Sequence, residues 1–144
     1  MDYWCFTSPS NWFSLSLPGN WAEYEEEEDG TYSFFNKEKW SGNLRISQLH
    51  WNSEEDEIDQ ASKYVQSELT DNSNAILTKI GDWDAVFYSE KSQDESLIYY
   101  WVTGSKNNLF ACSFTTDKLS LIKEIHSEEL EIVEKILNSI KILK

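Results

Sequence analysis

The stretches LIYYWV (residues 97–102) and LFACSF (residues 109–114) are apolar or aromatic at nearly every position. A strand with one solvated face alternates apolar with polar residues, whereas a strand covered on both faces stays apolar throughout. Gly104 and the polar residues up to Asn108 separate the two stretches by a hairpin-length connection. These stretches therefore predict a pair of antiparallel strands that is covered on both sides.

Further strand signals lie on either side of this pair. Phe13, Leu15 and Leu17 alternate with serines and end at the turn sequence Pro18-Gly19-Asn20, which is typical of a half-buried strand. By the same criteria we expect strands over residues 21–28, 31–36, 44–51, 75–80 and 85–88, with turns at Asp29-Gly30, 41–43 and Gly81-Asp82. Because the connections are short, the sequence predicts a mainly antiparallel sheet of about seven or eight strands.

Two segments have helical periodicity instead. Apolar residues recur every three or four positions in 54–70, where Ser53 and Asp56 form a capping-box pattern, and again in the C-terminal segment, where Ser127 is the expected cap. The residues concerned are Ile58, Ala61, Val65 and Leu69 in the first segment and Leu130, Val133, Leu137 and Ile140 in the second. Since the later strands lack a polar face, we expect one helix on each face of the sheet, an α+β fold of the α/β/α sandwich type.

The length of 144 residues predicts a single domain over residues 1–144, with 1–11 as an irregular N-terminal extension. Cys5 and Cys112 are expected to be free thiols, because two cysteines are too few for a disulfide scaffold. The first residues lack the pattern of a secretory signal, and no apolar run reaches 18 residues. We therefore expect a soluble, cytoplasmic protein.

The pattern Phe13-x-Leu15-x-Leu17-Pro18-x-x-Trp21 is followed by a hairpin, a helix, a second hairpin and a closing helix that ends in ILNSI, residues 136–140. This order, over about residues 13–143, resembles the PsbP-like sandwich proteins, a superfamily that includes small bacterial domains of unknown function. The resemblance implies an α/β/α sandwich with an accessory, binding or assembly role. It implies no catalytic residues, because the members share no catalytic set.

The charge is strongly acidic, with 12 Lys and Arg against 26 Asp and Glu and a net charge of −14. Such a charge repels nucleic-acid phosphates and anionic membranes, so neither is an expected partner. Residues 1–36 hold seven acidic and no basic residues: Asp2, Glu23, Glu25, Glu26, Glu27, Glu28 and Asp29. Two interpretations stay open, namely an acidic edge that prevents strand aggregation and a surface that binds a basic partner.

Motifs for cofactor or metal chemistry are weak. The five glycines lie in separate turns and form no phosphate-binding loop, and Cys5, His50, Cys112 and His126 lack the spacing of metal ligands. Cys112 with His50 or His126 is the one arrangement that offers a thiol nucleophile and a base. No cofactor or metal is expected, and we do not expect an enzyme.

The sequence thus favours a non-enzymatic protein-binding domain with a basic protein as partner, for example an immunity protein that masks a cationic toxin. The predicted binding residues are the acids of the first hairpin and two tryptophans at turns: Glu23, Glu25, Glu26, Glu27, Glu28, Asp29, Trp40 and Trp83. The alternative is a small-ligand-binding or catalytic domain with its pocket between sheet and helix.

Overall fold

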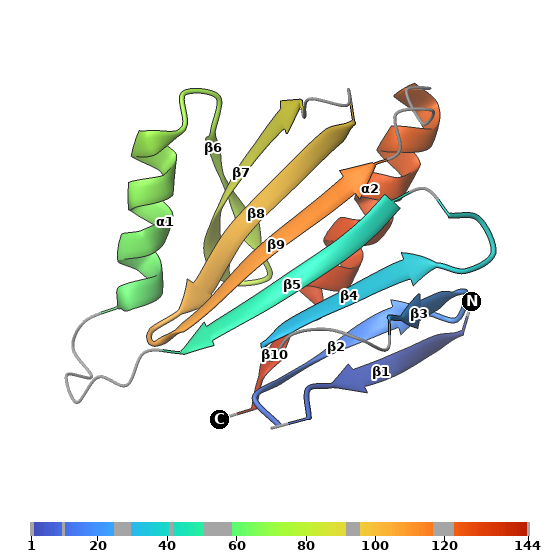
Figure 1. The fold of residues 1–144 in the computed structure, drawn as a ribbon. Coiled ribbons are helices and arrows are strands. Elements are labelled where there is room, and N and C mark those ends of the chain that lie inside the picture. Colours follow the sequence, from blue (N-terminus) through green and yellow to red (C-terminus); the bar gives the residue numbers. More distant parts are fainter. Residues whose placement is uncertain are drawn as a thin grey trace.

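The computed structural model describes residues 2–9, 11–24, 30–40, 42–50, 59–91, 96–116 and 123–143. Seven strands form one antiparallel sheet in the order β3-β4-β5-β9-β8-β7-β6, and a smaller antiparallel sheet has the order β1-β2-β10 (Figure 1). The elements are β1 (Tyr3–Thr7), β2 (Phe13–Pro18), β3 (Trp21–Glu23), β4 (Thr31–Asn36), β5 (Gly42–His50), α1 (Gln60–Asp71), β6 (Ile76–Ile80), β7 (Trp83–Lys91), β8 (Leu97–Ser105), β9 (Asn108–Thr116), α2 (Lys123–Asn138) and β10 (Lys141–Ile142). The predicted α+β class and mainly antiparallel sheet are confirmed.

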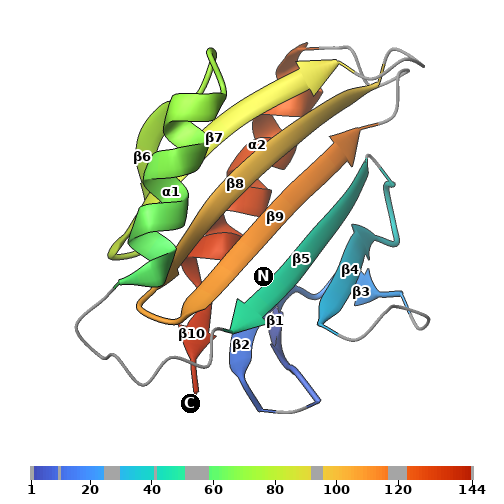
Figure 2. The same cartoon turned by 60° about the vertical axis from the view of Figure 1, so that its left-hand side comes forward.

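The two helices lie on opposite faces of the seven-stranded sheet (Figures 1 and 2). On one face, Val65 of α1 belongs to an apolar cluster with Val86 and Val102. On the other face, Ile136 of α2 belongs to the main core together with Trp101. Since neighbouring residues of a strand point to opposite faces, the consecutive Trp101 and Val102 face different helices. This arrangement explains why β8 and β9 are apolar throughout.

The small sheet closes the core on the α2 side. Phe13, Leu15 and Leu17 of β2 are almost fully buried in the main core, as their alternation predicts. The prediction that residues 1–11 form an irregular extension is wrong for the N-terminal strand, because β1 pairs along its whole length with β2 and sets Phe6 opposite Leu15. Phe6 is itself buried, with its ring 5.0 Å from that of Phe34, so tertiary packing holds this strand in place.

Both helices differ from their predicted starts. The first begins at Gln60 rather than at 54, and its N-cap is Asp59, whose Oδ1 accepts a hydrogen bond from the Ser62 N–H at 2.9 Å. The predicted cap residues 53 and 56 lie outside the described residues. The second begins at Lys123, so Ser127 lies within the helix and is not its N-cap. A serine before an apolar periodic segment predicts a cap, but serines also occur inside helices.

Candidate functional site

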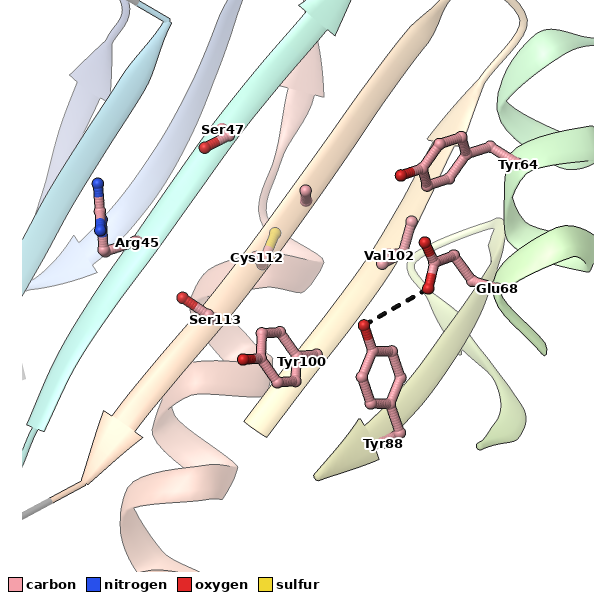
Figure 3. A pocket seen from close by; sticks show the side chains of 10 residues that line it. Arg45, Ser47, Tyr64, Glu68, Tyr88, Tyr100, Val102, Cys112 and Ser113 are labelled. Atoms are coloured by element: carbon pink, nitrogen blue, oxygen red, sulfur yellow. Dashed lines mark hydrogen bonds between the residues drawn. The ribbon is translucent and has the colours of Figure 1, made fainter. Parts of the chain in front are cut away.

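A pocket lies between α1 and the sheet (Figure 3). Helix α1 packs on β7 and β8 and reaches β9, at one half of the sheet. Beside it is a cavity of about 370 Å³, which we call the tyrosine pocket, lined by Arg45, Ser47, Tyr64, Glu68, Tyr88, Tyr100, Val102, Ala111, Cys112 and Ser113. Its position agrees with the predicted alternative of a pocket between sheet and helix.

The strand register builds the floor of this pocket. Tyr88 of β7 is opposite Tyr100 of β8, which is opposite Ser113 of β9, which is opposite Arg45 of β5. Residues that are paired across neighbouring strands point to the same face, so these four side chains form one row across the sheet. The rings of Tyr88 and Tyr100 stack with their centroids 4.8 Å apart and their planes 22° from parallel.

The wall of the pocket comes from α1. Tyr64 and Glu68 are four residues apart, so they lie on the same side of the helix and both line the cavity. The Tyr88 hydroxyl donates to Glu68 Oε2 over 3.5 Å, and the Asn72 side chain donates to the same oxygen at 2.9 Å. The carboxylate of Glu68 therefore links the helix to the floor of the pocket, as the dashed line in Figure 3 shows.

Both floor tyrosines are protonated at neutral pH. Burial raises the pKa of Tyr88 to about 12, and the negative charge of Glu68 adds to the effect. Burial also raises the pKa of Tyr100 to about 12, helped by a 2.7 Å hydrogen bond from its hydroxyl to Glu90 Oε1. The hydroxyls of Tyr88 and Tyr100 donate to the carboxylates of Glu68 and Glu90, whose charges make this end of the pocket negative. Arg45 brings positive charge to the opposite end.

Residues on the same face extend this row toward β3. Asn43 lies two positions before Arg45 on β5, and its Oδ1 accepts hydrogen bonds from the Tyr24 hydroxyl at 2.7 Å and the Trp40 indole N–H at 3.0 Å. We define the open face as the following exposed or half-buried residues: Tyr24, Trp40, Asn43, Arg45, Tyr64, Tyr88 and Tyr100. The face thus combines tryptophan, tyrosine and the one arginine of the chain.

The predicted binding residues have separate places in the structure. Trp40 is 48% exposed on the open face, and Glu23 is exposed at the end of β3. Trp83 is half-buried and packs against the main core, stacked on Phe110 at a centroid distance of 5.8 Å. It is therefore a packing residue and not an exposed anchor. Residues 25–29, the rest of the acidic hairpin, lie outside the described residues.

The thiol of Cys112 is not placed for catalysis. It is buried, and burial raises its pKa to about 12, so the thiol stays neutral and a poor nucleophile. His50 pairs with Asn108 at a point four residues along β9 from Cys112, about 13 Å away at the usual rise of a strand. The His50 ring packs on Trp12 at 4.4 Å, and the side chain of His126 lies outside the described residues.

A second cavity lies on the α2 side of the molecule. This cavity of about 500 Å³ between α2 and the small sheet is lined by Tyr3, Ser16, Pro18, Ile132, Lys135, Ile136 and Ser139. Its lining holds one charged group, Lys135, and no carboxylate, so it has fewer groups that could bind a polar ligand than the tyrosine pocket has. Within the described ranges, no three His, Cys, Asp or Glu side chains gather as metal ligands would.

Comparison with known proteins defines the family. The model of a domain of unknown function, DUF3805, matches residues 2–144. The chain belongs to the DUF3805 family. No curated protein matches it. In the part of this DUF3805 chain that the structure describes, neither helix has the length and apolar character needed to cross a membrane.

Two solved structures resemble this DUF3805 chain. A crystal structure from Bacteroides thetaiotaomicron VPI-5482 is 33% identical with a TM-score of 0.78, and the match covers 100% of this chain but 50% of that one. This chain thus spans half the length of that protein. The solution structure of cyanobacterial PsbP (CyanoP) from Synechocystis sp. PCC 6803 is 10% identical with a TM-score of 0.61, covering 97% of this chain and 92% of that one. The predicted resemblance to the PsbP-like fold is confirmed.

Proposed function

We propose that this DUF3805 chain is a non-enzymatic protein-binding domain and that its open face binds a basic protein. The observation that carries the proposal is the composition of that face. Tyrosine, tryptophan and arginine are the residues most enriched at the energetic centres of protein interfaces. Tyr64 and Trp40 are 40% and 48% exposed, although side chains of this size are usually buried.

Charge supports a basic partner. The net charge of −14 attracts a cationic protein over several ångströms and speeds the encounter. Glu68 and Glu90 add carboxylates beside the tyrosines of the open face. An immunity-type protein that masks a cationic toxin is one form of this function, and it needs no catalytic group of its own.

A second candidate function rests on the tyrosine pocket itself. Its volume of about 370 Å³ lies within the range of small-molecule sites, and Arg45 and Glu68 supply charges of opposite sign. A small-ligand-binding domain would use these groups to orient a polar molecule inside the pocket. It would leave Trp40 and Tyr24, which lie outside the pocket lining, without a role.

The test begins with a partner that is identified rather than merely captured. The chain is immobilised, proteins that it retains from a lysate of its own organism are identified by mass spectrometry, and each is purified and titrated against the chain by calorimetry. We expect a basic protein whose affinity falls about thirtyfold in Trp40→Ala or Tyr64→Ala, as at an interface hot spot.

The matched control is Glu131→Gln, which changes an exposed residue of α2 on the other side of the sheet. Its affinity should equal that of the unchanged chain. Unchanged affinity in both aromatic variants would show that the open face is not the interface. A purified partner of acidic composition would contradict the expected charge of the partner.

A further inference from the structure

One end of the tyrosine pocket gathers aromatic rings around a space. Tyr88 and Tyr100 stack side by side on the floor, and Tyr64 projects from α1 toward the cavity on the far side of Glu68 (Figure 3). The two floor rings are half-buried, and Tyr64 is 40% exposed, so part of each ring is open to a ligand. The π-face of a tyrosine attracts a cation within about 6 Å of the ring centre.

Two carboxylates stand beside these rings. Glu68 reaches the pocket from α1, and Glu90 lies two residues beyond Tyr88 on β7, on the same face of the sheet. A carboxylate accepts about four hydrogen bonds. Among the described residues, the Tyr100 hydroxyl donates to Glu90, and three groups donate to Glu68: the Tyr64 hydroxyl, the Tyr88 hydroxyl and the Asn72 amide. Each carboxylate therefore has acceptor capacity for a further donor.

The charges around this end of the pocket favour a cation from outside the chain. Arg45 is two strands away from Tyr100, about 10 Å at the usual strand spacing. Lys79, at the β6 edge of the sheet, is paired with Asp84 at 2.8 Å. Burial is the largest cause of the raised pKa values of Tyr88 and Tyr100, and nearby negative charge adds to it: that of Glu68 and Glu90 at Tyr88, and that of Glu90 at Tyr100.

We infer that a lysine or arginine side chain of the partner protein binds in the space lined by Tyr64, Glu68, Tyr88 and Tyr100, beside Glu90, whose carboxylate lies next to this lining at the Tyr100 hydroxyl. The alkyl part of that side chain packs along the tyrosine rings, and its charged group lies between the two carboxylates. We call this space the cation subsite. The inference rests on the proposed function and specifies which group of the partner the open face recognises.

The experiment uses small probes, so that it does not depend on the identity of the partner. The ¹⁵N-labelled full chain is titrated at low ionic strength with Nα-acetyl-lysine methylamide, with the corresponding arginine derivative, and with the norleucine derivative as an uncharged analogue of lysine. We expect shifts at Tyr64, Tyr88 and Tyr100 with the cationic probes and none with norleucine. The larger response identifies the preferred side chain.

The variants Glu68→Gln and Glu90→Gln each remove one negative charge and keep the size of the side chain. We expect each to bind the preferred probe about fivefold more weakly, whereas Glu131→Gln binds as before. The amide spectrum of each variant, recorded without probe, shows whether the fold is kept. Equal shifts from norleucine, or no shifts from either cation, would overturn the inference.

Binding of the purified partner to variants distinguishes a failure of this inference from a failure of the proposed function. If Trp40→Ala weakens partner binding but Glu68→Gln and Glu90→Gln leave it unchanged, the cation subsite is wrong and the protein-binding function stands. If neither aromatic variant, Trp40→Ala or Tyr64→Ala, weakens partner binding, the open face is not the interface, whatever the small probes show.

Discussion

Tyr88 and Tyr100 give the open face a measurable electrostatic property. Burial, with Glu68 for the first and Glu90 for the second, raises their pKa to about 12 from the ordinary value of 10.0. In the unfolded chain both phenols lose their protons near pH 10, whereas the folded chain keeps them. The free energy of unfolding should therefore be unaffected by these two groups below pH 10 and should fall as the pH rises from 10 to 12.

Ultraviolet titration of phenolate absorbance in the folded chain measures this directly. The phenolate absorbance of at least two tyrosines should appear only at a pH well above 10.0, the ordinary pKa of tyrosine. Glu90→Gln should bring the titration of Tyr100 to lower pH, because the hydrogen-bond acceptor of its hydroxyl becomes uncharged. Replacement of Tyr100 by Phe identifies its share of the signal. Complete titration of all tyrosines near pH 10 before unfolding would contradict the described surroundings of the two phenols.

At the level of single residues, the sequence predicts which side of a helix or strand a residue lies on better than it predicts which residues of other elements lie beside it. The spacing of Tyr64 and Glu68 is enough to place both on one side of α1. That Tyr88 lies beside Tyr100 depends on the register of the β7–β8 pair, which the sequence of their connection does not specify. For the same reason Trp40 and Trp83 look alike as tryptophans near turns, although the long-range contact with Phe110 packs only Trp83, which is half-buried, against the main core.

At the level of elements, Asp59 holds the start of α1 against the β8–β9 hairpin. Its Oδ1 accepts from the backbone N–H of Ser62 at 2.9 Å and from that of Lys106 at 3.0 Å. The Lys106 carbonyl in turn accepts from the N–H of Ala61, the second residue of the helix, at 2.9 Å. One carboxylate thus caps the helix that carries Tyr64 and fixes it to the sheet.

Replacement of Asp59 by Ala should lower the free energy of unfolding by about 1–2 kcal/mol, because one helix N–H and one hairpin N–H lose their acceptor. Urea unfolding followed by tryptophan fluorescence gives the value. Asp59→Asn is the matched control, since an asparagine oxygen also caps a helix and should cost less. Equal losses in the two variants would show that the cap hydrogen bonds do not account for the effect.

Elements with a clear period are predicted well, and those held by distant partners are not. The apolar runs of β8 and β9 identify covered strands because a whole stretch carries the signal. Strand β10 has two residues and directly follows α2, so its pairing with β2 leaves no local pattern. Strand β1 has five residues, and its place in the fold depends on partners in β2 that lie 7 to 15 positions further along.

At the level of the whole molecule, charge and shape have different roles. The net charge of −14 acts over distances set by ionic strength and influences how fast a partner arrives. The tyrosine and tryptophan side chains act on contact and influence how long it stays. Composition predicts the first property from the sequence alone. The second depends on a fold that brings residues of α1, β5, β7 and β8 to one surface, which is why the sequence did not predict the tyrosine pocket's residues.

These two roles predict different kinetics for the purified partner. Surface plasmon resonance should show the association rate constant falling about tenfold or more between ~20 mM and ~500 mM NaCl, because salt screens the attraction. The dissociation rate constant should change less. Tyr64→Ala should raise the dissociation rate constant and keep the same salt dependence of association, since it removes a contact and no charge. An association rate constant that is independent of salt would show that attraction between the acidic chain and a basic partner does not guide their encounter.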